Sequence, residues 1–185
     1  LNRRSLAQVR DLLGRSRGIV LVTGPTGAGK TTTLYSALNV LGGRARNIMT
    51  VEDPVEYEFP AIRQTQVRPR AGLTFATAIR SLLRQDPDVI MIGEIRDRET
   101  MTAALSYSLS GHLVLATLHA NSANQALDRI INFFPEERRQ QLLMDLSLNL
   151  RSIISQRLLP RREGKGRIAA VEILLNSPLI SDLIF

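Results

Sequence analysis

The stretch GPTGAGKTT, residues 24 to 32, has the residue types and spacing that bind phosphate groups. Glycines let the backbone turn so that successive N–H groups point at phosphate oxygens, and a helix starting here adds partial positive charge. Lys30 brings a full positive charge to the β- and γ-phosphates of a nucleotide, and the Thr31 hydroxyl can bind Mg²⁺. The predicted phosphate-binding residues are Gly24, Pro25, Thr26, Gly27, Ala28, Gly29, Lys30, Thr31 and Thr32.

An acidic residue follows an apolar run in DPDVIMIGEIRD, residues 86 to 97. At the tip of a buried strand beside a phosphate loop, Glu94 can hold water on Mg²⁺ or polarise the attacking water. The alternative is that Glu94 caps the next helix, although Asp97 is better placed for that. We therefore assign Glu94 to the nucleotide site and, together with Thr31, to Mg²⁺, directly or through water.

A second acidic group, Glu52, Asp53 and Glu56, surrounds a proline in TVEDPVEY, residues 50 to 57. Hydrolysis of a nucleotide requires a carboxylate that orients water in line with the γ-phosphate. The group is a candidate for this role. The spacing alone leaves a surface acidic turn as the alternative.

Arginines between this turn and the next apolar strand could neutralise the charge on a transferred phosphoryl group. They are Arg63, Arg68, Arg70, Arg80 and Arg84. Each one alone is also compatible with a solvated surface position. We expect at least one to act at the nucleotide, from the same chain or from a neighbouring subunit, and the candidates are Arg70, Arg80 and Arg84.

The chain has two histidines, His112 and His119, at the ends of the apolar run HLVLATLH. A strand rises about 3.3 Å per residue, so roughly 23 Å separates them, and both cannot contact one phosphate in a single chain. We predict that His119, at the carboxyl end, senses the γ-phosphate; the alternative is a polar residue that closes the strand. His112 is expected to pack locally or to act across an interface.

The elements that must position these residues alternate between strand and helix. Apolar runs predict strands at residues 18–24, 47–54, 88–94, 112–119 and 167–175. Helical spacing predicts helices at about 3–15, 30–41, 74–85, 97–109, 123–132 and 136–157, and alternation predicts a hairpin at 55–67. Strands that are apolar on both faces imply an α/β domain with a mostly parallel sheet, helices on both faces and ligands at the carboxyl ends of the strands.

We interpret residues 1–185 as one such domain. The chain begins at Leu1 and ends in NSPLISDLIF, where Ser177 can cap a helix that Pro178 begins. We therefore expect further sequence on both sides.

Composition narrows the classes of partner. The formal net charge is +7, and all 24 basic residues except Lys30 and Lys165 are arginines, which suits a nucleotide or an anionic membrane surface. Aromatic residues make up only 4%, so platforms for stacking single-stranded bases are not expected. The absence of cysteine excludes disulfides and thiolate zinc sites. No apolar run reaches the roughly 18 residues that span a bilayer.

Four blocks, GPTGAGKTT, VEDPVEY, DPDVIMIGEIRD and GHLVLATLH, resemble in sequence and order the Walker A, Asp, Walker B and His boxes of one superfamily. It is the secretion-ATPase superfamily of type II secretion and type IV pilus motors, and the resemblance covers nearly the whole chain. It implies a RecA-like P-loop domain that hydrolyses ATP in a hexameric ring, with ATP between subunits and usually a further N-terminal domain. It also implies that Lys30 binds phosphate, that Glu56 activates water and that Glu94 is the Walker B glutamate. By the same resemblance, His112 and His119 are the two His-box residues.

Within the superfamily, residues 124–159 resemble the pilus retraction motors, whereas QTQVRPRAGLTF, residues 64–75, resembles the assembly motors. The four-cysteine zinc insert that extension and secretion motors often carry near residues 155–167 is missing, and we predict no zinc. We predict a hexameric, ATP- and Mg²⁺-dependent retraction ATPase for twitching motility. It is expected in the cytoplasm, bound at the inner membrane to a platform protein of the pilus or secretion machine.

Other functions stay open at this point. They are a pilus assembly or type II secretion ATPase, a RecA-like nucleic-acid motor and a nucleotide-gated adaptor without turnover. The predicted 136–157 helix is the candidate element for coupling nucleotide closure to the pilus base, and the basic loop between Arg157 and Arg167 could face acidic partners or the membrane.

Overall fold

The computed structural model describes residues 3–42, 46–162 and 164–185. The strands are β1 (Gly18–Thr23), β2 (Ile48–Glu52), β3 (Arg63–Gln66), β4 (Val89–Ile92), β5 (Leu113–Leu118), β6 (Leu150–Pro160) and β7 (Arg167–Leu175). The α-helices are α1 (Arg3–Gly14), α2 (Lys30–Gly42), α3 (Phe75–Leu82), α4 (Arg98–Leu109), α5 (Ala123–Asn132), α6 (Glu136–Asn149) and α7 (Pro178–Ile184). Short 3-10 helices, η1 (Pro69–Ala71) and η2 (Leu83–Gln85), flank α3.

The strands form one seven-stranded sheet in the order β3-β2-β4-β5-β1-β6-β7. All neighbouring pairs are parallel except β6 and β7, which are antiparallel. The predicted mostly parallel α/β sheet is therefore confirmed. Because β1, β2, β4 and β5 run in the same direction, the residues that follow their carboxyl ends meet at one edge of the sheet.

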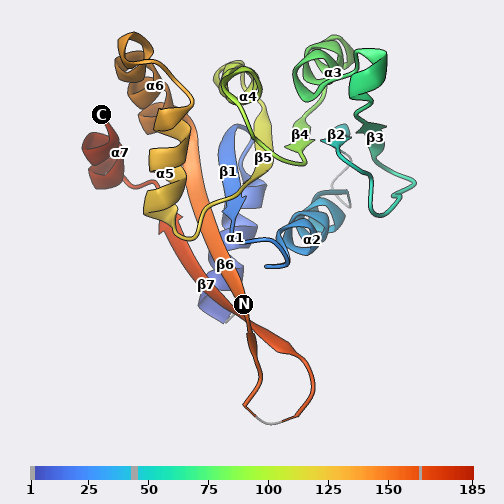
Figure 1. Cartoon of the computed structure of the whole chain (residues 1–185), viewed down its shortest axis with the longest axis vertical. Helices are drawn as coiled ribbons and strands as arrows, with labels where there is room; N and C mark the ends of the chain where they lie inside the picture. The colour runs from blue at the N-terminus through green and yellow to red at the C-terminus, as the bar shows by residue number, and fades with distance from the viewer. Residues whose placement is uncertain (1–2, 43–45, 163) are drawn as a thin grey trace.

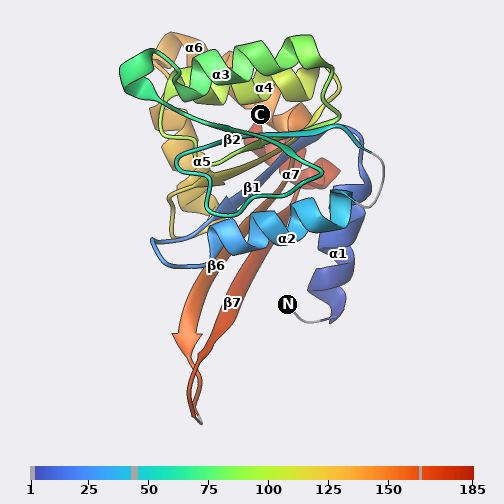
Figure 2. The ribbon, with the colours of Figure 1, turned by 90° about the vertical axis from the view of Figure 1, so that its right-hand side faces the viewer.

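Helices cover both faces of this sheet (Figures 1 and 2). One core cluster joins the sheet to α3, α4, α5 and α6, and a second joins it to α1 and α2. Neighbouring residues of a strand belong to different clusters, as Leu21 and Val22 of β1 do, because successive side chains point to opposite faces. This two-sided burial explains why the strands read as continuous apolar runs.

The predicted hairpin at residues 55–67 is wrong. β3 pairs in parallel with β2, from Met49 opposite Arg63 to Glu52 opposite Gln66, and residues 53–62 form the connection. Within that connection, Ile62 is buried and Phe59 packs against the α1–α2 core cluster. The apolar residues that suggested an alternating strand therefore anchor a loop.

The predicted helix at 136–157 is also wrong from residue 150 onward. α6 ends at Asn149, and Leu150 begins β6, which pairs in parallel with β1 and antiparallel with β7. Ile153 and Ile154 are buried on opposite faces of the sheet. Pairing with two strands distant in sequence overrides the local helical pattern, because β-branched residues fit a covered sheet better than a helix.

The segment after α5 therefore contains a shorter helix and a long hairpin. β6 and β7 extend beyond the other strands as a two-stranded projection (Figure 1).

Near the C-terminal end of the chain, the Ser177 side chain caps α7 by accepting a hydrogen bond from the Ile180 N–H, as predicted. In the parts of the chain that the structure describes, no helix is long and apolar enough to cross a membrane.

Candidate active site

The phosphate loop connects β1 to α2, as the sequence predicts. Gly27 and Gly29 have φ angles of 76° and 83°, in the left-handed region that glycine adopts without steric cost. Gly24 approaches β6 closely: a Cβ at this position would lie 2.3 Å from the Gln156 carbonyl oxygen. The loop therefore requires its glycines both for its turns and for its contact with the sheet.

Lys30 begins α2 and is 9% exposed. Its Nζ donates hydrogen bonds to the Gly24 carbonyl at 2.9 Å and to the Pro25 carbonyl at 3.0 Å. Burial lowers the pKa of Lys30, and the negative charge of Glu94 opposes that shift. The ammonium group therefore lies inside the loop and faces an acidic partner across the pocket.

The cavity beside this loop has a volume of about 670 Å³, a size that accommodates a nucleotide. It is lined by Thr26, Gly27, Ala28, Gly29, Lys30, Thr31, Thr32, Leu34, Glu52, Asp53, Pro54, Glu56, Phe75, Met91, Gly93, Glu94, Arg96, Thr117, His119 and Leu158. The structure thus brings together residues that follow the ends of β1, β2, β4 and β5.

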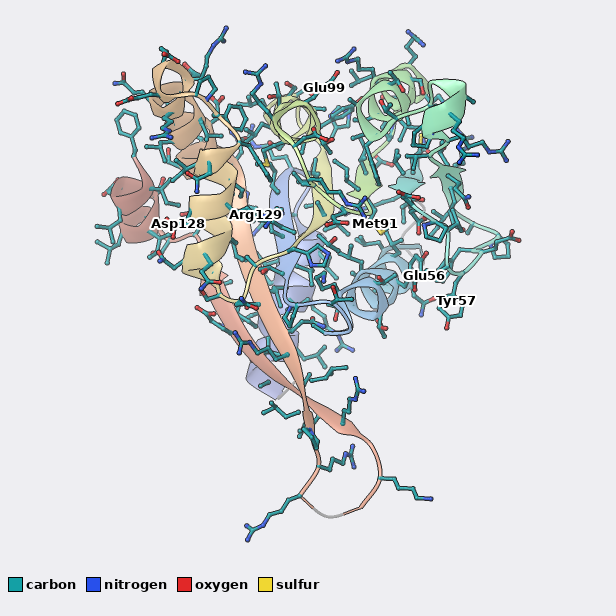
Figure 3. All side chains as sticks on the ribbon, in the orientation of Figure 1. Glu56, Tyr57, Met91, Glu99, Asp128 and Arg129 are labelled. Atoms are coloured by element: carbon teal, nitrogen blue, oxygen red, sulfur yellow. The ribbon has the colours of Figure 1, made fainter. Side chains whose placement is uncertain are left out.

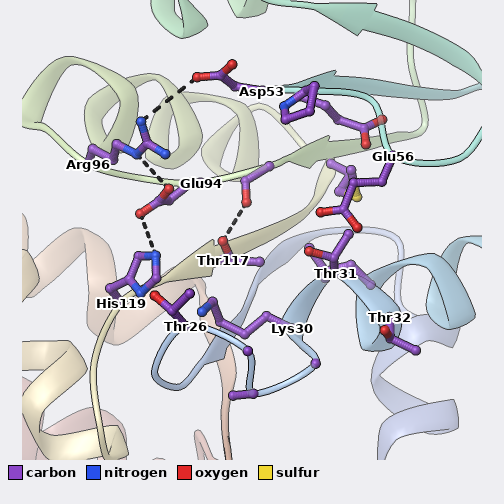
Figure 4. Close-up of a pocket in the computed structure, with 18 of the residues that line it drawn as sticks. Thr26, Lys30, Thr31, Thr32, Asp53, Glu56, Glu94, Arg96, Thr117 and His119 are labelled. Atoms are coloured by element: carbon purple, nitrogen blue, oxygen red, sulfur yellow. Dashed lines mark hydrogen bonds and ion pairs between the residues drawn. The ribbon is translucent and has the colours of Figure 1, made fainter.

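Glu94 and His119 meet in this pocket (Figure 4). His119 Nε2 lies 3.1 Å from Glu94 Oε1, and Arg96 Nε donates to Glu94 Oε2 at 2.6 Å. Helix capping belongs instead to Asp97, whose carboxylate accepts the Thr100 N–H at 2.8 Å. Glu94 is thus free of the capping role that the sequence left as its alternative.

Burial lowers the pKa of His119, and the positive charge of Lys30 lowers it further, while Glu94 acts in the opposite direction. A neutral imidazole with its proton on Nε2 can still donate to the Glu94 carboxylate, as the 3.1 Å separation requires. Burial and the charge of Lys30 thus favour the neutral form of His119, which lines the pocket beside Glu94.

His112 lies at the opposite end of β5, as the length of the predicted strand requires. Its Nδ1 is 3.1 Å from the Tyr107 carbonyl and 2.9 Å from Ser110 Oγ, and its ring packs edge-on against Tyr107. His112 does not line the pocket of its own chain. The sequence left two possibilities for His112, local packing or a role across an interface. The structure shows that His112 packs locally, and a role across an interface stays a prediction.

The arginine candidates are not brought to the pocket of their own chain. Arg70 lies in η1 and Arg84 in η2, and both are exposed. Arg80 of α3 forms a salt bridge with Glu99 of α4. Arg70, Arg80 and Arg84 do not line this pocket, and a role for one of them at a nucleotide, in the same chain or in a neighbouring subunit, stays a prediction.

Sequence reasoning missed two residues that shape the site. Arg96 pairs with Glu94 and lies 3.9 Å from Asp53, so it joins the ends of β4 and β2. Gln156 of β6 donates from Nε2 to the Ala28 carbonyl at 2.6 Å and accepts from Thr33 Oγ1 at 2.8 Å. Arg96 stands two residues after Glu94, so its position beside the acidic residue was a usable signal in the sequence. Gln156 carried no such signal, because the sequence predicted a helix where β6 lies.

The residues at the start of α2 fit a magnesium ion that accompanies a nucleotide. The hydroxyl of Thr31 and the carboxylate of Glu94 both line the pocket, and Mg²⁺ prefers a few protein oxygens together with water and phosphate. Over residues 3–42, 46–162 and 164–185, no group of three or more His, Cys, Asp or Glu side chains could hold a metal ion.

The chain is similar in sequence to known proteins. The model of the protein family described as "Type II/IV secretion system protein" matches residues 1–176 of this chain. The type IV pilus ATPase PilU of Pseudomonas aeruginosa is 51% identical over 187 residues, covering 95% of this chain and 47% of PilU. The type II secretion system protein E of Klebsiella pneumoniae is 54% identical over 156 residues, covering 84% of this chain and 30% of that protein.

The fold agrees with these relatives. The crystal structure of the pilus retraction motor PilT with bound ADP superimposes with a TM-score of 0.90 at 42% identity, covering 100% of this chain and 53% of PilT. The ATPase DotB of Legionella pneumophila gives a TM-score of 0.85 at 32% identity, over 96% of this chain and 50% of DotB. This chain spans about half the length of PilU and of PilT. The family match, the four sequence blocks and the assembled pocket together show that the chain belongs to the type II/IV secretion system protein family.

Proposed function

We propose that this chain is the ATP-hydrolysing domain of a hexameric type IV pilus motor of the retraction type. The observation that carries the proposal is one pocket lined by Lys30 of the phosphate loop and by two carboxylates that follow different strands, Glu56 after β2 and Glu94 after β4. A phosphate-binding cation opposite candidate carboxylates is the arrangement that hydrolysis of a phosphoanhydride requires.

In this proposal, each residue of the pocket has a separate role in ATP hydrolysis. Lys30 and the backbone N–H groups of the loop bind the phosphates, and Glu56 accepts a proton as water attacks the γ-phosphorus and the bond to ADP breaks. Figure 4 places Glu56 and Thr31 on one side of the pocket and Glu94 and His119 on the other. Mg²⁺, held by Thr31 and through water by Glu94, would neutralise charge on the phosphate oxygens.

The proposal includes residues from a neighbouring subunit. In a ring of six subunits, an arginine among Arg70, Arg80 and Arg84 reaches the nucleotide of the neighbouring subunit. Their exposure on η1, α3 and η2 supports this, because a partner can reach all three side chains, although Arg80 is also paired with Glu99. The ring works in the cytoplasm against an inner-membrane platform protein, and its cofactors are ATP and Mg²⁺.

A second function has support of its own. The type II secretion system protein E of Klebsiella pneumoniae is 54% identical, slightly more than PilU over a shorter alignment, and residues 64–75 resemble assembly motors. An assembly or secretion ATPase with the same site is therefore the alternative. All three share the nucleotide pocket, so the choice among them depends on surfaces outside it.

ATP turnover tests the shared chemistry. Lys30→Ala removes the cation of the loop and should reduce ATP turnover to background, as measured by phosphate release with the full-length protein. Lys165→Ala, which removes the other lysine of the chain from the tip of the β6–β7 hairpin, is the matched control and should retain turnover. Normal hydrolysis by a folded Lys30→Ala protein would contradict the proposed site.

Deletion of the gene in its host tests the direction of the motor. Loss of a retraction ATPase should leave normal or excess surface pili and impair twitching. Cells without pili would identify an assembly ATPase, and normal pili with a secretion defect would identify a type II secretion ATPase.

A further inference from the structure

Glu52 is the last residue of β2 and immediately precedes the loop of residues 53–62 that carries Glu56. Its carboxylate is buried, and the residue is only 3% exposed. Three groups donate hydrogen bonds to it: the Tyr35 hydroxyl, Thr50 Oγ1 at 2.5 Å and Gln64 Nε2 at 3.0 Å. A buried charge without partners is strongly unfavourable, so these donors are the condition for keeping a carboxylate here. Glu52 is thus held in one place by α2, β2 and β3.

Tyr35 connects this carboxylate to the loop above it. Its hydroxyl donates to Glu52 and at the same time accepts the backbone N–H of Glu56 at 3.1 Å. Tyr35 lies on α2, five residues after Lys30, so the helix that begins at the phosphate loop directly contacts the backbone of Glu56. Burial, followed by the hydrogen bond with Glu52, raises the pKa of Tyr35 to about 12, which keeps the hydroxyl protonated as a donor.

The rest of the loop is held from the other side. Gln64 Oε1 accepts the Phe59 N–H at 2.7 Å, and Gln64 Nε2 donates to the Tyr57 carbonyl at 2.9 Å. The rings of Tyr57 and Phe59 pack against Tyr35 with centroids 5.8 Å and 5.3 Å away. Figure 3 shows Glu56 and Tyr57 side by side on this loop. The backbone around Glu56 is therefore held by two side chains, Tyr35 and Gln64. Tyr35 belongs to α2, the helix that begins at the phosphate loop.

We propose that Tyr35, oriented by Glu52, is a positioning residue that sets the distance between the Glu56 carboxylate and the phosphate loop. The inference rests on the proposed function, in which Glu56 activates water. A small displacement of a catalytic base lowers the rate of the chemical step far more than it lowers substrate affinity. The Tyr35 hydroxyl therefore acts on turnover and leaves nucleotide binding to Lys30 and the loop.

Tyr35→Phe tests this in the full-length protein, since it removes the hydroxyl and keeps the ring. The expected result is a kcat for ATP about tenfold lower, with the Kd for ATP unchanged within about twofold. Tyr107→Phe is the matched control: Tyr107 is also a buried tyrosine, and its hydroxyl donates to the Ile79 carbonyl in the opposite core. It should keep the kcat of the wild type.

A double-mutant cycle separates positioning from general stability. Glu56→Asp keeps a carboxylate at a shifted position and should retain measurable turnover. If Tyr35 acts through Glu56, Tyr35→Phe should reduce kcat much less in the Glu56→Asp background than in the wild type. Additive losses would overturn the inference, as would an unchanged kcat in Tyr35→Phe or an equal loss in Tyr107→Phe.

Thermal unfolding shows whether each variant folds. If Tyr35→Phe does not fold, Glu52→Gln provides the second test, because an amide there cannot accept from all three donors; it should lower kcat and spare ATP affinity, and an unchanged kcat would overturn the inference. Absence of ATP turnover in the wild-type protein itself would reject the proposed function and this inference together. A wild-type enzyme that hydrolyses ATP beside a fully active Tyr35→Phe variant would reject this inference alone.

Discussion

The two carboxylates proposed for catalysis differ in their surroundings. Glu94 has a side chain that is 14% exposed and contacts His119 and Arg96, whereas Glu56 is exposed and is held through its backbone N–H. Both carboxylate oxygens of Glu94 are engaged, Oε1 with His119 and Oε2 with Arg96. This difference supports Glu56 as the base and Glu94 as the group that orders the metal-bound water.

Neutralising each carboxylate should therefore have different consequences. Glu56→Gln should lower kcat by about 100-fold or more while ATP binding persists, because the amide keeps the shape but not the basicity. Glu94→Gln should slow turnover and also weaken binding of ATP with Mg²⁺. Steady-state kinetics and equilibrium nucleotide binding measure both effects. Wild-type hydrolysis by Glu56→Gln together with an inactive Glu94→Gln would mean that the two roles are exchanged.

His119 should make the stability of the protein depend on pH. Its pKa is lowered in the folded chain from an ordinary value of 6.5, so below that pH the unfolded chain binds a proton here that the folded chain does not. Stability should fall as the pH drops through this window, and His119→Gln should remove that part of the fall. Urea unfolding from about pH 7.5 to about pH 5.5 measures it. Parallel losses of unfolding free energy in wild type and His119→Gln would contradict the assignment.

At the scale of the elements, β6 supports the phosphate loop. Its backbone lies so close to Gly24 that a Cβ there has no room, and its Gln156 side chain joins the Ala28 carbonyl to Thr33 of α2. The loop is thus fixed by a strand more than 100 positions away in the sequence. The hairpin of β6 and β7, and not a continuous helix, connects the pocket to the basic residues Arg161, Arg162, Lys165 and Arg167.

Removal of the Gln156 amide should therefore affect both stability and nucleotide binding. Gln156→Leu leaves the buried Ala28 carbonyl without its donor and should lower the free energy of unfolding by about 1–3 kcal/mol. It should also weaken ATP binding, because the loop loses its support. Gln140→Leu, on the exposed face of α6, is the matched control and should change neither quantity. Unaltered ATP affinity in Gln156→Leu would show that the loop keeps its shape without β6.

At the scale of the whole molecule, the predicted nucleotide-binding arginines lie outside the pocket of their own chain. Glu56 and Lys30 line one pocket, while Arg70, Arg80 and Arg84 lie away from it on η1, α3 and η2. If these arginines serve the neighbouring subunit, each active site is built from two chains. That arrangement links hydrolysis to the movement of subunits, which a motor requires.

Mixed assemblies test the shared site. Glu56→Gln protein and Arg80→Ala protein should each be nearly inactive, but a 1:1 mixture of full-length subunits should recover about a quarter of wild-type turnover, because that share of interfaces combines intact residues from both chains. Arg70→Ala and Arg84→Ala are measured in the same way. A mixture of Glu56→Gln with Lys30→Ala is the control and should stay inactive, since both residues line the pocket of one chain. No recovery with any of the three arginine variants would place the arginine elsewhere.

Much of the site was open to prediction from short stretches of sequence. The phosphate loop, the strand that ends before Glu94 and the separation of His112 from His119 depend on residues close together in the chain. Glycine spacing, helix starts and the rise of a strand are local properties, so local patterns report them reliably. The parallel sheet also followed, because strands that are apolar on both faces must be covered on both faces.

The sequence by itself therefore determined the fold class, the phosphate loop and the residues that follow the strand ends. Only the tertiary structure decided that residues 150–160 form a strand, that residues 53–62 form a loop, and that Tyr35 contacts Glu56, Arg96 contacts Glu94 and Gln156 contacts the phosphate loop. These features depend on contacts between residues distant in the chain. In isolation, a segment such as 150–157 favours helix and strand about equally, and the neighbouring strands β1 and β7 provide the free energy that selects one of them.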